Sequence, residues 1–62
     1  MKNQLISILD EMNEQMELAK AELEKFVTKG NNSAGTRVRG HMQKIKSLAQ
    51  DLRVGVQDAK NA

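Results

Sequence analysis

The sequence predicts an all-α protein in which two long amphipathic helices form an antiparallel hairpin. Three observations predict it: apolar residues recur at alternating spacings of 4 and 3 in both halves, one cluster of turn-forming residues separates the halves, and the 62-residue chain contains no Pro, which would interrupt a long helix. No segment shows the apolar-polar alternation that is typical of a strand. We therefore expect residues 1–62 to form a single helical-hairpin domain.

The first helix is predicted over residues 3–28 and the turn over residues 29–32. Lys29 suits the negative carboxyl-terminal end of a helix, and Gly30 is free to adopt the positive φ with which many helices end. Asn31, Asn32 or Ser33 can cap the next helix by accepting backbone N–H groups. The heptad pattern of the first helix, of the kind found in coiled coils, consists of Leu5, Leu9, Met12, Met16, Ala19, Leu23 and Phe26.

The second helix is predicted over residues 32–60, with the same heptad spacing. Its apolar positions are Val38, Met42, Ile45, Ala49, Leu52, Val56 and Ala59. Further apolar residues lie beside or outside the two patterns, so the apolar arc is wider than a two-stranded coiled coil needs. Because so short a chain buries little surface alone, we expect two copies to form a homodimer, a four-helix bundle.

Charge is distributed unevenly along the chain. Residues 1–27 carry three basic and six acidic side chains, a net charge of −3, whereas residues 28–62 carry seven basic and two acidic side chains, a net charge of +5. Such an asymmetry indicates that the basic half binds a polyanion. The alternative is that the two halves simply attract each other.

A seven-residue repeat in the second helix concentrates the positive charge further. The repeat reads RVRGHMQ, KIKSLAQ and DLRVGVQ from residue 37, which places basic residues in two columns along the helix. One column stays basic, but the other changes from Arg37 and Lys44 to Asp51 and Asp58, so the positive charge gathers at the turn end. The candidate nucleic-acid-binding residues are Lys25, Lys29, Arg37, Arg39, Lys44, Lys46 and Arg53.

Two interpretations of these basic residues remain open. They could bind backbone phosphates, helped by free N–H groups at the start of the second helix. Alternatively, they could be solvated positions flanking a coiled coil and paired with Glu17, Glu22 or Glu24 of the first helix or of a partner. Without Trp or Tyr there is no platform for stacking bases, so any nucleic-acid binding is expected to be salt-sensitive and weakly sequence-specific.

The sequence offers no chemistry typical of an enzyme. His41 is the sole His and the chain has no Cys, so we expect no catalytic residues, no metal site, no cofactor and no small-molecule substrate. The apolar runs are too short for a membrane span or a secretory signal, and we expect a cytoplasmic protein that does not associate with membranes.

The segment KGNNSAGTRVR at residues 29–39 resembles the turn of the bacterial histone-like nucleoproteins of the chlamydial type, a linker-histone-like family. The shared features are a Gly-Asn turn, small residues, and an Arg-x-Arg entering a helix of Lys-rich apolar heptads, preceded by an acidic first helix. The resemblance implies a nucleoid-associated protein that binds duplex DNA, and it points to Arg37, Arg39, Lys44 and Lys46.

The sequence also differs from that family in two respects. The best-known members continue into a long Lys/Ala-rich tail, whereas this sequence ends at Asn61-Ala62, so we expect a short form without the tail. Gly40 and His41 replace residues that commonly favour a helix.

The leading hypothesis is a histone-like protein that binds duplex DNA non-specifically and bridges or compacts it. The alternatives are a coiled-coil module for protein interaction and an RNA-binding hairpin dimer.

Overall fold

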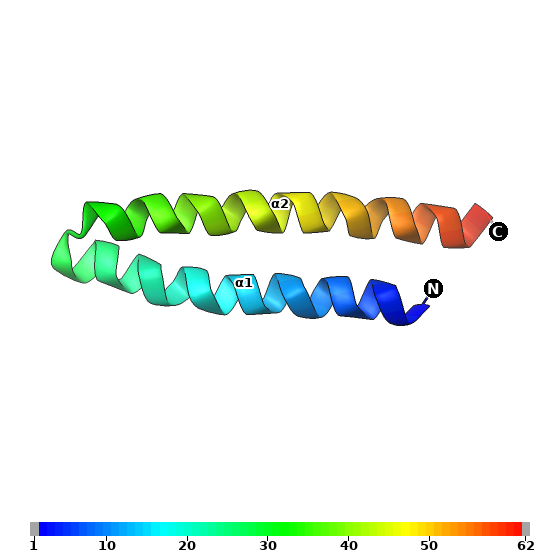
Figure 1. Ribbon diagram of the computed structural model, residues 1–62, viewed down its shortest axis with the longest axis horizontal. Coiled ribbons are helices and arrows are strands. Elements are labelled where there is room, and N and C mark those ends of the chain that lie inside the picture. The colour runs from blue at the N-terminus through cyan, green and yellow to red at the C-terminus, as the bar shows by residue number, and fades with distance from the viewer. Residues whose placement is uncertain (1, 62) are drawn as a thin grey trace.

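The computed structural model describes residues 2–61, with side chains from residue 3 onward, and shows an antiparallel hairpin of two helices (Figure 1). Helix α1 spans Lys2–Lys29 and helix α2 spans Asn32–Asn61, and together they measure 49 × 15 × 11 Å. The predicted all-α two-helix hairpin is confirmed. Each helix extends one residue beyond its predicted range of 3–28 or 32–60, α1 at both ends and α2 at its carboxyl end. Met1 and Ala62, which the expected 1–62 domain includes, lie outside the described residues.

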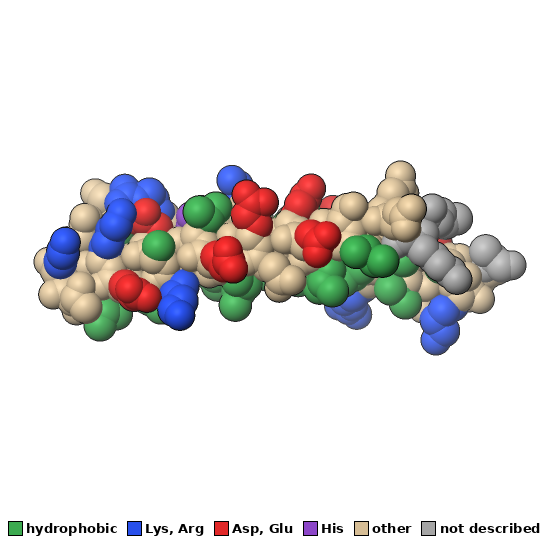
Figure 2. All heavy atoms as spheres, turned by 90° about the horizontal axis from the view of Figure 1, so that it is seen from below, with side chains coloured by type: hydrophobic (Ala, Val, Ile, Leu, Met, Phe, Trp, Pro, Cys, Tyr) green, Lys and Arg blue, Asp and Glu red, His purple; other side chains and the backbone are tan. Residues whose placement is uncertain are grey.

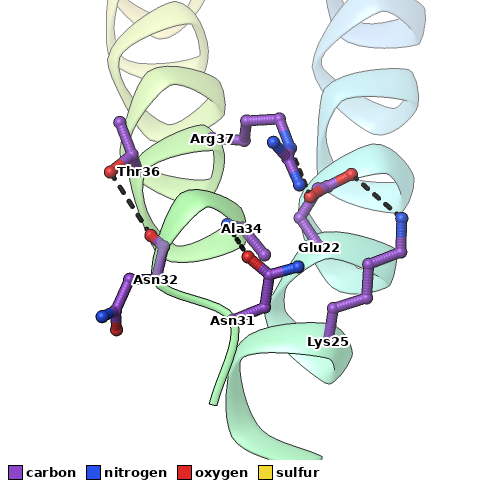
Figure 3. Close-up of polar contacts among 7 residues, drawn as sticks. All are labelled: Glu22, Lys25, Asn31, Asn32, Ala34, Thr36 and Arg37. Carbon is purple, nitrogen blue, oxygen red and sulfur yellow. Dashed lines mark hydrogen bonds and ion pairs between the residues drawn. The ribbon is translucent and has the colours of Figure 1, made fainter. Parts of the chain in front are cut away.

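Gly30 and Asn31 alone connect the two helices. Gly30 has a φ of 63°, the left-handed conformation expected of it, and its N–H donates to the carbonyl of Phe26 at 3.1 Å. Of the three capping candidates, Asn31 is the residue whose side chain caps α2: its Oδ1 accepts the backbone N–H of Ala34 at 3.1 Å (Figure 3). The short turn thus ends α1, starts α2 and reverses the direction of the chain.

Small residues let the two helices approach each other closely. Ala19 and Ala34 are the buried hydrophobic residues of the described chain, at 5% and 0% exposure. At Gly35 an added Cβ would lie 2.8 Å from the Phe26 ring, so the absence of a side chain makes room for that ring. The core is therefore thin, and the packing depends on close backbone contact more than on large side chains.

The helices meet along one flank of the predicted heptad pattern. One predicted column on each helix faces the partner helix and is buried or half-buried over most of its length: Leu5, Met12 and Ala19 on α1, and Val38, Ile45 and Leu52 on α2. The last members of these columns, Phe26 and Ala59, are exposed. The second column in the contact differs from the prediction: it is Ile8, Gln15 and Glu22 on α1, and His41, Leu48 and Gly55 on α2. The predicted second columns turn outward, leaving Leu9, Met16, Leu23, Met42 and Val56 42–54% exposed.

A polar pair lies in the second column of the contact, which the sequence did not predict to face the other helix. His41 donates from Nδ1 to Gln15 Oε1 at 2.6 Å, across the contact between the helices. Both side chains are half-buried, so the hydrogen bond offsets the cost of withdrawing them from water. Gly55 on the same flank makes room for Leu5.

Gly40 provides a test of this packing. It lies inside α2, and an added Cβ there would meet nothing within 4 Å. We expect Gly40→Ala to raise the free energy of unfolding by about 1 kcal/mol, because Ala favours the helix over Gly by that amount. Urea unfolding at a fixed protein concentration measures it, with Gly30→Ala as a contrast: that change should lower the free energy, because the φ of 63° strains any side chain. A destabilised Gly40→Ala variant would contradict the position of Gly40 on an open part of α2.

Candidate nucleic-acid interface

Basic side chains gather at the turn end of the hairpin. Figure 2 shows Lys and Arg side chains clustered there, acidic side chains along the middle of the molecule, and hydrophobic side chains along one edge. Lys25, Lys29, Arg37 and Arg39 lie nearest the turn, whereas Lys44 and Lys46 lie about 18 and 21 Å along α2 from its start, since a helix rises 1.5 Å per residue. We call these six predicted site residues, which belong to the turn-side half of the hairpin, the basic tip. The seventh, Arg53, lies about 10 Å beyond Lys46 along α2, since a helix rises 1.5 Å per residue.

The basic tip presents its charges on two sides of the hairpin. Arg39 lines a groove with Leu23 and Phe26, on the side where the exposed hydrophobic residues lie. Lys44 lines a different groove, together with Glu11 and Glu14, on the other side. The positive surface therefore wraps around the turn end and does not form one flat patch.

One acidic residue neutralises part of the basic tip. The Glu22 carboxylate accepts a hydrogen bond from Arg37 Nε at 2.6 Å and lies 3.6 Å from Lys25 Nζ (Figure 3). The Arg37 hydrogen bond is the main cause that lowers the pKa of Glu22 below its usual value; partial desolvation opposes it, and the charges of Arg37 and Lys25 reinforce it. Glu22 is thus ionised at neutral pH and holds two of the six cations of the basic tip.

The other four cations of the basic tip remain unpaired. Within the described residues, Lys29, Arg39, Lys44 and Lys46 have no carboxylate within 4.0 Å, and all four are exposed; the same holds for Arg53. Pairing with helix-one carboxylates, the alternative considered for the basic residues, therefore describes Lys25 and Arg37 but not these others. The unpaired cations are available to an external anion.

The start of α2 offers fewer free N–H groups than the sequence indicated. The Asn31 side chain takes the N–H of Ala34, and the Asn31 carbonyl lies 3.3 Å from the N–H of Gly35, so these donors already have partners. His41 is half-buried against Gln15 in the helix contact. The sequence offered Glu17, Glu22 and Glu24 alike as partners for the basic residues; in the structure Glu22 is the one that is half-buried and faces Arg37.

Clusters of metal-ligating side chains and membrane-spanning helices would each indicate a different kind of protein. In the part of the chain that the structure describes, no three His, Cys, Asp or Glu side chains come together in a way that could hold a metal ion. Neither described helix has an apolar stretch long enough to cross a bilayer.

Comparison with known proteins identifies a family. The model of the family described as Histone H1-like protein Hc1 matches residues 7–62, nearly the whole chain. No curated protein and no solved structure matches. The family match agrees with the resemblance seen in the turn segment and extends it over both helices. The chain therefore belongs to the Hc1 family of histone H1-like proteins.

Proposed function

We propose that this protein is a histone-like, nucleoid-associated protein that binds duplex DNA non-specifically through phosphate contacts at the basic tip. Membership in a histone H1-like family supports a DNA-binding role in general and a structural role over an enzymatic one. The observation that carries the more specific proposal is the set of unpaired, exposed cations at the turn end: Lys29, Arg39, Lys44 and Lys46.

The side chains at the basic tip suit phosphates better than bases. Lys and Arg are long, flexible donors without acceptor groups, and they can follow a phosphate backbone on both sides of the turn end. The single aromatic residue, Phe26, lies against Gly35 and is 42% exposed, so the basic tip offers at most one ring for stacking, fewer than a surface that binds successive bases needs. Contacts of this kind position a protein on DNA without reading its sequence.

Lys25 and Arg37 would join the interface by exchanging partners. A phosphate oxygen can replace the Glu22 carboxylate as the acceptor for Arg37 without leaving the guanidinium unpaired. The exchange has a cost, because Glu22 would then lie near phosphates of the same charge. Glu22 thus weakens DNA binding at the basic tip without preventing it.

The proposal includes a homodimer. Large hydrophobic side chains on both helices are about half exposed, among them Met16, Leu23 and Met42. A second copy would cover them and form a four-helix bundle. A dimer carries two basic tips, so it can hold two stretches of duplex together, which is the simplest route to compaction of the nucleoid.

A titration of duplex DNA at several salt concentrations tests the proposed function. Four phosphate contacts predict that the logarithm of the binding constant falls with the logarithm of the salt concentration with a slope of about −4. No binding at a salt concentration of about 50 mM would overturn the proposal. Competition with structured RNA is the second arm, and a clear preference for RNA would favour the RNA-binding alternative.

Arg39→Ala tests the position of the interface. Loss of one phosphate contact should reduce the salt slope by about 1 and weaken binding to all DNA sequences alike. Lys60→Ala is the matched control, because Lys60 belongs to the same column of α2 and its loss changes the net charge equally, but it lies at the opposite end of the helix. Equal effects of the two changes would mean that binding follows net charge and not the basic tip.

Glu22→Gln tests the exchange of partners. Removing the carboxylate charge frees Lys25 and Arg37, so duplex DNA should bind more tightly and the salt slope should become steeper by up to about 2. Asp58→Asn is the control: it removes the same charge, but Asp58 lies at the end of α2 far from the turn and has no cation within 4.0 Å among the described residues. If the two variants bind alike, Glu22 does not restrain the basic tip.

A further inference from the structure

A continuous row of exposed hydrophobic side chains runs along one side of the hairpin. We call it the apolar face and define it by two columns with seven-residue spacing: Leu9, Met16 and Leu23 on α1, and Met42, Ala49 and Val56 on α2. The five larger residues are 42–54% exposed, and Figure 2 shows hydrophobic side chains along one edge of the molecule. Monomeric proteins rarely leave such a row uncovered.

The two columns belong to one surface. A groove of about 420 Å³ is lined by Met16 and Leu23 from α1 and by Val38 and Met42 from α2. Ile6 and Val27, which are 60% and 71% exposed, extend the apolar face on α1, because residues three or four positions apart on a helix are neighbours. The surface thus crosses from one helix to the other and runs along the hairpin.

We infer that the apolar face binds the same face of a second copy, with α1 of each copy lying on α2 of the other and both basic tips at the same end. This inference rests on the homodimer included in the proposed function and specifies its face and direction. A side of 49 × 15 Å offers roughly 700 Å² per copy, close to the 800 Å² per partner of a standard stable interface.

Symmetry leaves two ways to stack the apolar faces with the helices aligned. A two-fold axis parallel to the helices places α1 on the partner's α2, and both turns then lie at one end. A two-fold axis perpendicular to the helices and in the plane of the interface places α1 on α1 and α2 on α2, with the turns at opposite ends. Both arrangements bury the same hydrophobic residues, so hydrophobic burial does not decide between them.

The net charges of the two helices favour the first arrangement, in which α1 lies on the partner's α2. The range of α1 holds four basic and six acidic side chains, a net charge of −2, and that of α2 holds six basic and two acidic side chains, a net charge of +4. Stacking α1 on the partner's α2 brings helices of opposite net charge together, whereas the other arrangement stacks helices of like net charge.

The charged side chains that border the apolar face also favour α1 stacked on the partner's α2. Arg39, Lys46 and Arg53 each lie three residues before a member of the apolar face on α2, so they line its outer edge. Stacking α2 on α2 would bring this basic edge against its own copy. Stacking α1 on α2 brings it instead beside the edge of the partner's α1, where the partner's Asp10, the partner's Glu17 and the partner's Glu24 outnumber the partner's Lys20.

The arrangement has a consequence for the proposed DNA interface. Lys and Arg at the edge of a helix contact cover hydrophobic surface with their stems and keep their charges in water. The basic edge therefore stays in contact with solvent, where DNA phosphates compete with the partner's carboxylates for its charges, and the two basic tips lie next to each other. A dimer of this form grips neighbouring phosphates or two closely spaced stretches of duplex, not two duplexes at opposite ends of the bundle.

A pair of leucine substitutions tests the face. Leu23 and Leu18 are both 46% exposed on α1, but only Leu23 belongs to the apolar face. We expect Leu23→Glu to weaken dimerisation at least tenfold in sedimentation velocity experiments, because each dimer would bury two unpaired carboxylates. Leu18→Glu, with the same change of charge, should leave the dimer intact. If Leu18→Glu weakens dimerisation as much as Leu23→Glu, another face forms the interface.

Spin labels test the direction. The chain has no Cys, so Ser33→Cys and Gln50→Cys each provide one label site on α2. Double electron-electron resonance measures the distance between the two labels of a dimer. With the turns at one end, the two Ser33→Cys labels should lie within about 30 Å of each other. With the turns at opposite ends, they should lie about 40 Å apart or more. The Gln50→Cys labels, near the middle of α2, should be close in both arrangements and report dimer formation.

The outcomes separate this inference from the proposed DNA binding. A dimer with distant Ser33→Cys labels overturns the inferred direction, and a monomeric wild-type chain overturns the inference altogether. A dimer that behaves as expected in both experiments but binds no DNA supports the inference and contradicts the proposed function.

Discussion

Gly30 and Asn31 are the residues between two helices of 28 and 30 residues, and so short a connection forces the helices to lie antiparallel and side by side. Each helix then has one neighbour, which covers only part of its apolar arc. The flank in contact is the one where small residues permit close approach, including Ala19 and Ala34. The opposite flank stays exposed, and from this constraint follows the apolar face on which the proposed dimer rests.

Much of the fold could be predicted from the sequence, because heptad spacing, a Gly at the end of one helix and an Asn at the start of the next are local signals. The side on which the helices meet could not. Two apolar columns on each helix define the middle of a wide arc, and they do not say which edge of that arc packs within the hairpin. Gln15 and His41 look like surface residues in the sequence, yet they form a hydrogen bond between the helices.

The basic tip was visible in the sequence as a change of sign along one column of α2, from Lys44 to Asp51. Its division into paired and unpaired cations was not, because the Glu22–Arg37 contact joins residues 15 positions apart and depends on how the helices are rotated. The family match over residues 7–62 supports DNA binding in general, and the unpaired cations are the reason for proposing the turn end as its place. In this proposal one end of the hairpin serves phosphates and one side serves another hairpin.

The central claim is that duplex DNA binds at the turn end, and nuclear magnetic resonance tests it most directly. Backbone amide signals of the full chain would be followed while a short duplex of mixed sequence is added. The account predicts that the largest changes fall between residues 25 and 46, with small changes in residues 3–16 and 54–61. Changes of equal size along the whole of α2, or largest at its carboxyl end, would contradict it.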